Sequence, residues 1–329
     1  MKTNNFARWG TLTAVILLVA IAGGVLWAAR NFLKEEAMKQ AVHVLEKTAI
    51  RTTIYLNEVE IATRNTEWQV LKSLQPDSLL TYSRRIVELN PDLNGCSVTM
   101  EPGFFPTLGH NFSAYSVRNG KAIETVMEGD YDYYSQVWYK QARDAGRPVW
   151  VDPYEDSNEA GSLTSADMIA SYSVPLYKPD GKFVGVLSTD ISLPWLSQLI
   201  STDPPYEGAY FLMTGKSGKF LIHPDDEMVV YHSIFENTNA DAGSGVVELG
   251  KAMVAGRKGL QKLNLGGKDC LVFYQPIPLS GWSIAMVCPE SSITGRFDLI
   301  AGVLSVIIVI VLALTVLMYR RPASHHAVG

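Results

Sequence analysis

The region from Tyr131 to Asp190 concentrates side chains that suit the binding of a small cation. A protonated amine is costly to remove from water unless acceptors and a counter-charge replace its hydration. Asp190, at the end of a strand-like run, and Asp156, in a nearby turn, could supply that charge. Aromatic rings add π faces for a cation and polar tips for orientation. The aromatic residues of this region are Tyr131, Tyr133, Tyr134, Trp138, Tyr139, Trp150 and Tyr154.

Each of these residues also has a purely structural interpretation. Aromatic clusters more often form core than pocket, and we expect Trp150 to be core. Asp190 could cap the short helix expected from Pro194 to Ile200, and Asp156 could be a solvated turn residue. Only the combined spacing of the residues favours a binding site.

The other reactive residues show no arrangement typical of catalysis or metal binding. The sequence lacks GxSxG, P-loop and HExxH motifs, and its histidines have no metal-ligand spacing. We therefore expect no enzyme activity, cofactor or metal. The three cysteines form no CxxC pair. A hairpin centred near Leu279 would place Cys270 opposite Cys288, within reach of a disulfide, and two separate buried thiols are the alternative.

Two uncharged apolar segments, residues 9–29 and 299–319, are each long enough to cross a bilayer as a helix. A buried core helix and, for the first segment, a cleaved signal peptide are weaker interpretations, since Trp27 stands where a small residue should precede the cut. The short ends beyond these segments carry only basic charges, which favours ends in the cytoplasm. These charges are Lys2, Arg8, Arg320 and Arg321. The sequence therefore predicts a protein that crosses a membrane twice.

The part between the two spans is acidic. The chain has 33 acidic and 28 basic residues, and the short ends hold four of the basic ones and no acidic one, which leaves 24 basic residues against 33 acidic residues. This balance argues against nucleic-acid binding and mildly favours cationic ligands.

Residues 31–74 contain neither glycine nor proline, and their apolar positions recur near helical spacing. They predict a helix continuous with the first span, which would reach roughly 65 Å beyond the membrane at 1.5 Å per residue. Pro76 and Asp77 mark its expected end. A lone protruding helix would leave its apolar positions in water, so we expect it to pair with a second copy in a homodimer.

Short strand-like runs alternate with turn clusters from residue 93 onward. Hairpin turns are predicted at Asn119-Gly120, Pro179-Asp180-Gly181 and Gly266-Gly267. Asp203-Pro204-Pro205 separates two lobes with a similar pattern of elements. Antiparallel strands with few long helices predict α+β lobes. The expected boundaries are a cytoplasmic N-terminus at 1–8, a membrane helix at 9–30, a long extracytoplasmic helix at 31–74, a membrane-distal lobe at 75–202, a membrane-proximal lobe at 203–296, a second membrane helix at 297–319 and a short cytoplasmic tail at 320–329.

The order of these features resembles the double Cache family of bacterial sensor domains, whose lobes are PAS-like. The resemblance covers residues 31–296 and includes the long helix, the run GVLSTDISL, the hairpin GKSGKFLIHP and the final run GWSIAMVCPE. It implies a small ligand in the distal lobe and a proximal lobe that passes the change towards the membrane.

One subset of that family binds amino acids in the distal lobe, and its motif is similar to part of this sequence. The resemblance implies a ligand site made of Tyr131, Trp138, Tyr139, Tyr154, Asp156 and Asp190. In the subset an arginine two residues before the tryptophan holds the ligand carboxylate, and here that position is Gln136. An amine or amino-acid ligand is therefore expected, but Gln136 would contact the ligand carboxylate differently from the arginine of the subset.

The function expected from the sequence is that of an extracytoplasmic small-molecule sensor, an input module of signal transduction. Its expected partners are the ligand, the membrane lipid and a cytoplasmic or membrane signalling protein. Only ten residues follow Tyr319, too few for an output domain, so a receptor truncated before its output is an alternative. A membrane-anchored binding or scavenging protein that does not signal is the main rival, and an exported hydrolase ranks low.

Overall fold

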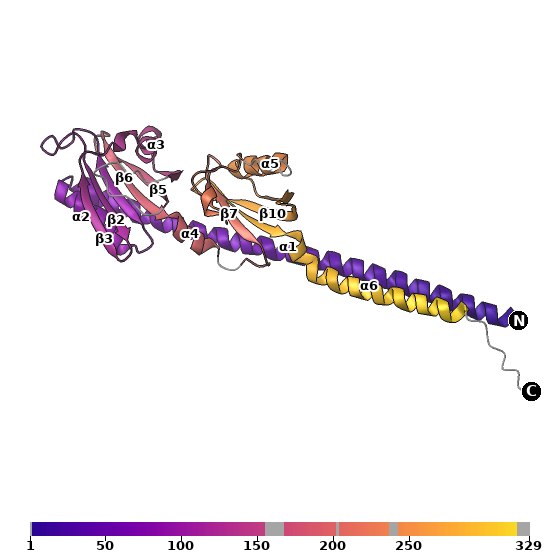
Figure 1. The fold of residues 1–329 in the computed structure, drawn as a ribbon. Coiled ribbons are helices and arrows are strands. Elements are labelled where there is room, and N and C mark those ends of the chain that lie inside the picture. Colours follow the sequence, from indigo (N-terminus) through magenta and orange to yellow (C-terminus); the bar gives the residue numbers. More distant parts are fainter. Residues whose placement is uncertain (1, 155–167, 202–203, 237–242, 321–329) are drawn as a thin grey trace, which may run out of the picture.

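The computed structural model describes residues 2–154, 168–201, 204–236 and 243–320. Two antiparallel sheets sit along one very long N-terminal helix, and a second long helix ends the described chain (Figure 1). The helices are α1 (Lys2–Lys72), α2 (Pro76–Leu89), α3 (Val137–Ala145), α4 (Leu193–Ile200), α5 (Gly243–Val254) and α6 (Glu290–Arg320), with short 3₁₀ turns η1 (Tyr133–Ser135) and η2 (Asp226–Met228). The strands are β1 (Gly95–Met100), β2 (Ser113–Asn119), β3 (Ala122–Glu128), β4 (Val149–Tyr154), β5 (Ile169–Tyr177), β6 (Phe183–Ser192), β7 (Tyr210–Thr214), β8 (Phe220–Ile222), β9 (Gly259–Leu265), β10 (Lys268–Ile277) and β11 (Trp282–Pro289).

The two sheets confirm the predicted α+β class. The distal sheet has the strand order β3-β2-β1-β6-β5-β4 and the proximal sheet has the order β8-β7-β11-β10-β9. α1 runs along one side of both sheets, and the opposite side carries α3 over the distal sheet and α5 over the proximal sheet (Figure 1). The turn predicted at Asn119-Gly120 joins β2 to β3, and Gly266-Gly267 joins β9 to β10. Both glycines of the second turn have positive φ, as a tight hairpin requires.

α1 is one continuous helix through the first apolar segment and both lobes, as predicted. It does not protrude alone, because Ala41, Leu45 and Ala49 are buried in the core of the chain itself. The Leu45 carbonyl accepts a bond of 3.5 Å from Gln275 of the proximal sheet. Farther along, the Thr63 hydroxyl lies 2.7 Å from that of Thr189 in the distal sheet. Each lobe therefore covers part of the apolar face of α1, and pairing of the helix with a second copy stays a prediction.

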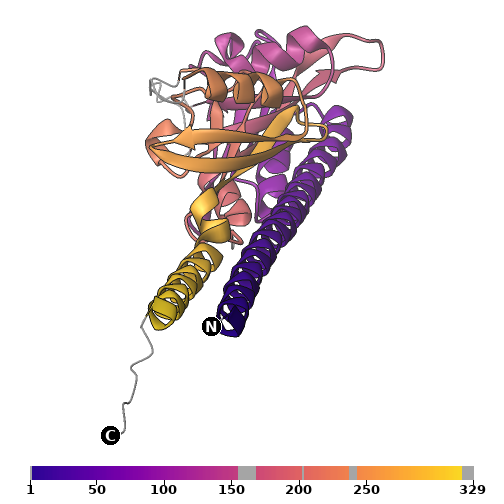
Figure 2. The same cartoon turned by 90° about the vertical axis from the view of Figure 1, so that its right-hand side faces the viewer.

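α1 and α6 run side by side away from the lobes, and the start of α1 and the end of α6 lie at the same end of the molecule (Figures 1 and 2). Each contains a stretch that is long and apolar enough to cross a membrane. Ion pairs join the helices near the proximal lobe: Arg30 Nε lies 2.7 Å from Asp298 Oδ1, and Lys34 binds Glu290.

The proposed pairing of Cys270 with Cys288 was wrong. In the β10–β11 ladder Cys270 lies opposite Pro289, and Cys288 lies opposite Leu271. The turn between the strands holds four residues, so opposed positions differ by one from those of a hairpin centred on a single residue. A shift of one residue moves a side chain to the other face of a sheet. The two thiols accordingly belong to different hydrophobic clusters, and both are free and buried.

Candidate functional site

Asp190 lies in the middle of the distal sheet, on β6, between Gly95 of β1 and Ser171 of β5. Its side chain is buried, with 4% exposed. Ser171 Oγ donates a hydrogen bond of 2.6 Å to Asp190 Oδ1, and Tyr154 Oη lies 2.6 Å from Ser171 Oγ. A serine hydroxyl has one hydrogen, so the Tyr154 hydroxyl is the donor to Ser171. The three side chains form one directed chain that ends on the carboxylate.

Hydroxyl groups surround this chain on the same sheet face. Neighbouring positions of β5 and β6 share a face at every second residue, which places Ser173 and Ser188 beside Ser171 and Asp190. Ser173 Oγ and Ser188 Oγ lie 2.9 Å apart. On the other side of Asp190, a Cβ atom at Gly95 would stand 2.9 Å from Asp190 Oδ2 and 3.1 Å from the Tyr115 hydroxyl oxygen. Glycine is therefore the residue that leaves room for both groups.

The local charge also affects a neighbouring thiol. Burial first, and then the negative charge of Asp190, raise the pKa of Cys96 well above its ordinary value. The thiol is thus held in its neutral form.

The predicted aromatic residues gather in one cluster beneath α3. Tyr131, Trp138 and Tyr139 pack there with Val151 and Val186 of the sheet. Tyr139 is fully buried, and its hydroxyl donates a bond of 3.1 Å to Glu101 Oε2. Burial raises the pKa of Tyr139. This part of the set has the character of core, as the structural interpretation allowed.

Tyr154 connects the two groups, because its ring packs against the edge of the aromatic cluster while its hydroxyl reaches Ser171. Gln136 lies at the start of α3, and its Nε2 donates a bond of 3.3 Å to the Asp132 carbonyl. Asp156 lies outside the described residues. The alternative role for Asp190 does not apply, since the cap of α4 is Ser192, whose hydroxyl accepts from the Trp195 amide at 3.3 Å.

The polar residues that the sequence-based interpretation missed are Tyr115, Ser171, Ser173 and Ser188. A signal for three of them was present, because β5 and β6 carry serine or aspartate at alternate positions of otherwise apolar runs. Alternation of this kind indicates one polar face on a buried strand.

The strand that carries Tyr154 also joins the two lobes. Asp152 of β4 accepts bonds from the backbone amides of Lys216 at 2.9 Å and Ser217 at 2.7 Å, in the turn between β7 and β8. It also accepts a bond of 3.2 Å from Trp282 Nε1 of β11. The rings of Trp150 and Trp282 meet at 5.1 Å, and Trp150 is buried as predicted.

The sequence and the fold are similar to those of known receptor proteins. The methyl-accepting chemotaxis protein PscA of Pseudomonas syringae pv. tomato is 22% identical over 301 residues, which are 89% of this chain and 42% of that protein. The extracellular domain of a protein assigned as a histidine kinase superposes with a TM-score of 0.66 at 20% identity, covering 82% of this chain and 98% of that domain. The ligand-binding domain of the Pseudomonas fluorescens chemoreceptor CtaA, solved with L-isoleucine, gives a TM-score of 0.58 at 19% identity, covering 82% and 98%.

The chain thus spans less than half the length of PscA, and its likeness to the solved domains is one of fold. Residues 30–297 match the family described as Cache domain. This range includes α2 to α5 and both sheets. The chain therefore belongs to the Cache family of sensor domains found in chemoreceptors and histidine kinases.

Proposed function

We propose that this chain is the extracytoplasmic sensor part of a two-pass bacterial inner-membrane receptor, and that its distal lobe binds a small molecule with a protonated amine. The observation that carries the proposal is the buried Asp190 carboxylate, which Ser171 and Tyr154 orient on a hydroxyl-lined sheet face. An ammonium group bound there would gain a counter-charge and oxygen acceptors in place of its hydration. The amino acid in the CtaA domain supports this ligand class.

Gln136 and Asp156 complete the proposed set of ligand-binding residues, as the sequence motif suggests. Gln136 can exchange neutral hydrogen bonds but lacks the charged fork that suits a carboxylate. Amines and amino-acid derivatives with a masked carboxylate should therefore compete well with free amino acids. Asp156 and Tyr154 would join Asp190 in holding the ammonium, and the buried cluster of Tyr131, Trp138 and Tyr139, against which Tyr154 packs, would form the aromatic wall behind Tyr154.

The test is thermal unfolding of the full chain in lipid nanodiscs with a panel of amines, amino-acid methyl esters and free amino acids. A ligand at a hundred times its dissociation constant stabilises by about 2.7 kcal/mol, which should raise the midpoint by several degrees. Asp190→Asn keeps the shape but removes the charge, and should weaken binding about 30-fold or more, because truncating a buried charge pair costs about 2–5 kcal/mol.

Two further variants complete this test. Asp180→Asn removes an exposed carboxylate from the β5–β6 turn and should leave the affinity unchanged. Gln136→Arg should shift preference towards free amino acids. Normal amine binding by Asp190→Asn, or a panel in which only anions or sugars bind, would show that the site is assigned wrongly.

A homodimer is proposed from the part of α1 that its own lobes leave uncovered. Ile50, Ile54, Ile61 and Trp68 are exposed and fall on one helix face, which suits a second copy of the same helix. Single cysteines at positions 50, 54 and 61 should cross-link between copies, whereas one at exposed Gln69, a quarter turn or more around the helix from Trp68, should not. Equal yields at all four positions would contradict the pairing.

A further inference from the structure

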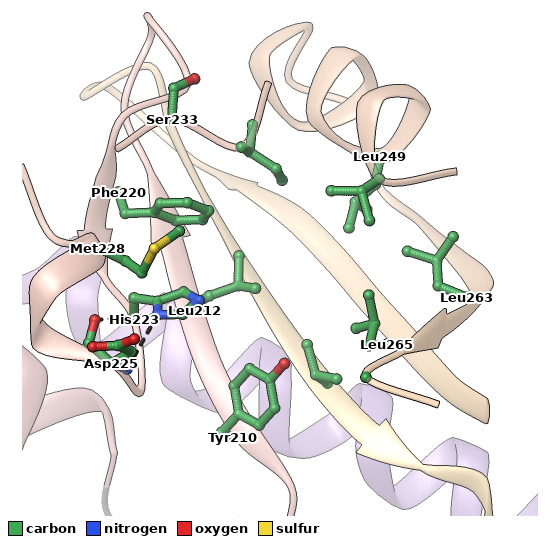
Figure 3. Close-up of a pocket in the computed structure, with 14 residues that line it drawn as sticks. Tyr210, Leu212, Phe220, His223, Asp225, Met228, Ser233, Leu249, Leu263 and Leu265 are labelled. Atoms are coloured by element: carbon green, nitrogen blue, oxygen red, sulfur yellow. Dashed lines mark hydrogen bonds between the residues drawn. The ribbon is translucent and has the colours of Figure 1, made fainter. Parts of the chain in front are cut away.

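The proximal lobe contains a concave space on the face of its sheet that α5 covers. A cavity of about 440 Å³ lies between α5 and the sheet, within the range of small-molecule sites (Figure 3). Most of its wall is hydrocarbon, including Leu212, Val246, Leu249, Leu263, Leu265 and Val287. Such a wall binds an apolar body in proportion to the area removed from water.

One side of this cavity carries the imidazole ring of His223. The backbone amide of Asp225 donates a bond of 3.1 Å to His223 Nδ1, and the Asp225 carbonyl oxygen lies 3.2 Å from the same nitrogen. When the amide bond is made, Nδ1 is the acceptor, and in the neutral ring the hydrogen then sits on Nε2. Figure 3 shows that this second ring nitrogen points into the cavity, across from the Tyr210 ring. The ring packs against Phe220 with centroids 4.9 Å apart. Burial lowers the pKa of His223, which favours the neutral ring.

The charge at this side excludes one class of ligand. Asp225 lines the cavity, and Asp226 and Glu227 follow it directly on the chain. An anion would meet this negative group without a charged donor from His223. A carbonyl oxygen, in contrast, can accept the Nε2 hydrogen without bringing a charge.

We propose that this cavity is a second ligand site, which binds an uncharged small molecule with a hydrocarbon body and one carbonyl oxygen. The body lies against the leucines and valines, and the oxygen accepts a hydrogen bond from His223 Nε2. This site goes beyond the amine site of the distal lobe and does not depend on it. Val287 lies on β11, which passes directly into α6 at Glu290, so its occupant would touch the strand that leads to the membrane.

The test uses the full chain in lipid nanodiscs, with cyclopentanone, cyclohexanone and cycloheptanone as probes in saturation-transfer NMR. Affinity should rise about fourfold for each added CH₂ group, which is about 0.8 kcal/mol. Cyclohexanecarboxylate, an anion of similar size, should bind more weakly than cyclohexanone. Hydrogen exchange should slow in α5 and β9 when cycloheptanone is present.

Matched variants separate the cavity from the lipid, into which these probes also partition. Leu249→Trp fills the cavity from α5 and should abolish the saturable component, whereas Lys251→Trp adds the same side chain on the exposed face of α5 and should not. His223→Phe keeps the ring packing but removes the donor, and should lower ketone affinity about fivefold, or ~1 kcal/mol. If Leu249→Trp does not fold, the affinity of His223→Phe for the ketones is the deciding measurement. Equal binding by His223→Phe and the unaltered chain overturns the proposal.

Discussion

The two sheets share an architecture but present opposite chemistry on the side away from α1. In the distal sheet, β6 places Ser188 and Asp190 on that face. In the proximal sheet, Ala285 and Val287 of the central strand β11 belong to the cluster beneath α5. Because side chains alternate along a strand, a few residues at every second position decide whether a covered face suits a charged or an apolar molecule. The shared fold covers one face of each sheet, and the side chains at alternate strand positions make that face polar or apolar.

The largest effect on the free energy of unfolding is expected at the contact between the two lobes, because tight packing there would make the lobes unfold together. Trp282 is fully buried, packs on Trp150 and donates to Asp152. Trp282→Ala should lower the free energy of unfolding by about 3–5 kcal/mol, because it leaves a large cavity. Leu279→Ala, at an exposed turn of the same hairpin, should change it by less than about 0.5 kcal/mol. Denaturant unfolding of both variants measures the difference, and similar midpoints would rule out a strong joint.

A smaller effect, on ligand affinity, should show that the proposed distal and proximal sites bind independently. Ser171→Ala removes the group between Tyr154 and Asp190, and should weaken amine binding about tenfold, which corresponds to about 1.4 kcal/mol for the bonds that are lost. It should leave the affinity for cycloheptanone unchanged, since the proximal cavity lies in the other sheet. Thr81→Ala removes an exposed hydroxyl in the same lobe as a control. Calorimetric titration of both ligands against each variant is the measurement, and parallel losses would show that the sites are not independent.

The smallest effect concerns the start of α6, where the proximal lobe joins the membrane helix. Lys262 Nζ lies 2.7 Å from Glu290 Oε2, and Lys34 binds the same carboxylate. Hydrogen bonds from Lys262, and then from Lys34, lower the pKa of Glu290 below its ordinary 4.5. The stability from this group is therefore complete above about pH 4.5 and is lost as pH falls through the lowered value.

Glu290→Gln should thus cost at most about 1 kcal/mol near neutral pH, because the pairs are partly exposed. The difference from the unaltered chain should shrink in unfolding measured below pH 4.5. A difference that grows on acidification would contradict this assignment.

Much of the fold follows from local patterns in the sequence. The long helix follows from the absence of glycine and proline over residues 31–74, and the hairpins follow from their turn residues. Cys270 and Cys288 show where such reasoning fails, since one extra turn residue moves the two thiols to opposite faces. The register depends on the geometry of the turn at Leu279 and Gly281, which both take positive φ, and not on the strands alone.

The candidate site was predictable only in part. Asp190 and Tyr154 were named from the sequence and lie in one hydrogen-bonded chain, and Tyr139 is fully buried in the aromatic cluster against which Tyr154 packs. Ring and acid types are the same in core and pocket, and only burial and partners distinguish them. The proximal cavity had no signal in the sequence, because its lining residues come from segments far apart in the chain, from Tyr210 to Val287.

The position of Asp152 makes the short β4 strand a direct connection between the proposed distal site and the proximal lobe. Only Pro153 separates Asp152, which holds the other lobe, from Tyr154, which reaches the Asp190 chain. The proline ring fixes one backbone torsion, so this link has few ways to absorb a displacement. A movement of the Tyr154 ring should therefore reach the turn at Lys216 at the speed of local loop motion, nanoseconds to microseconds, rather than wait for a slower domain rearrangement. In such a sensor the delay of the response would be set beyond the lobes, at the membrane helices.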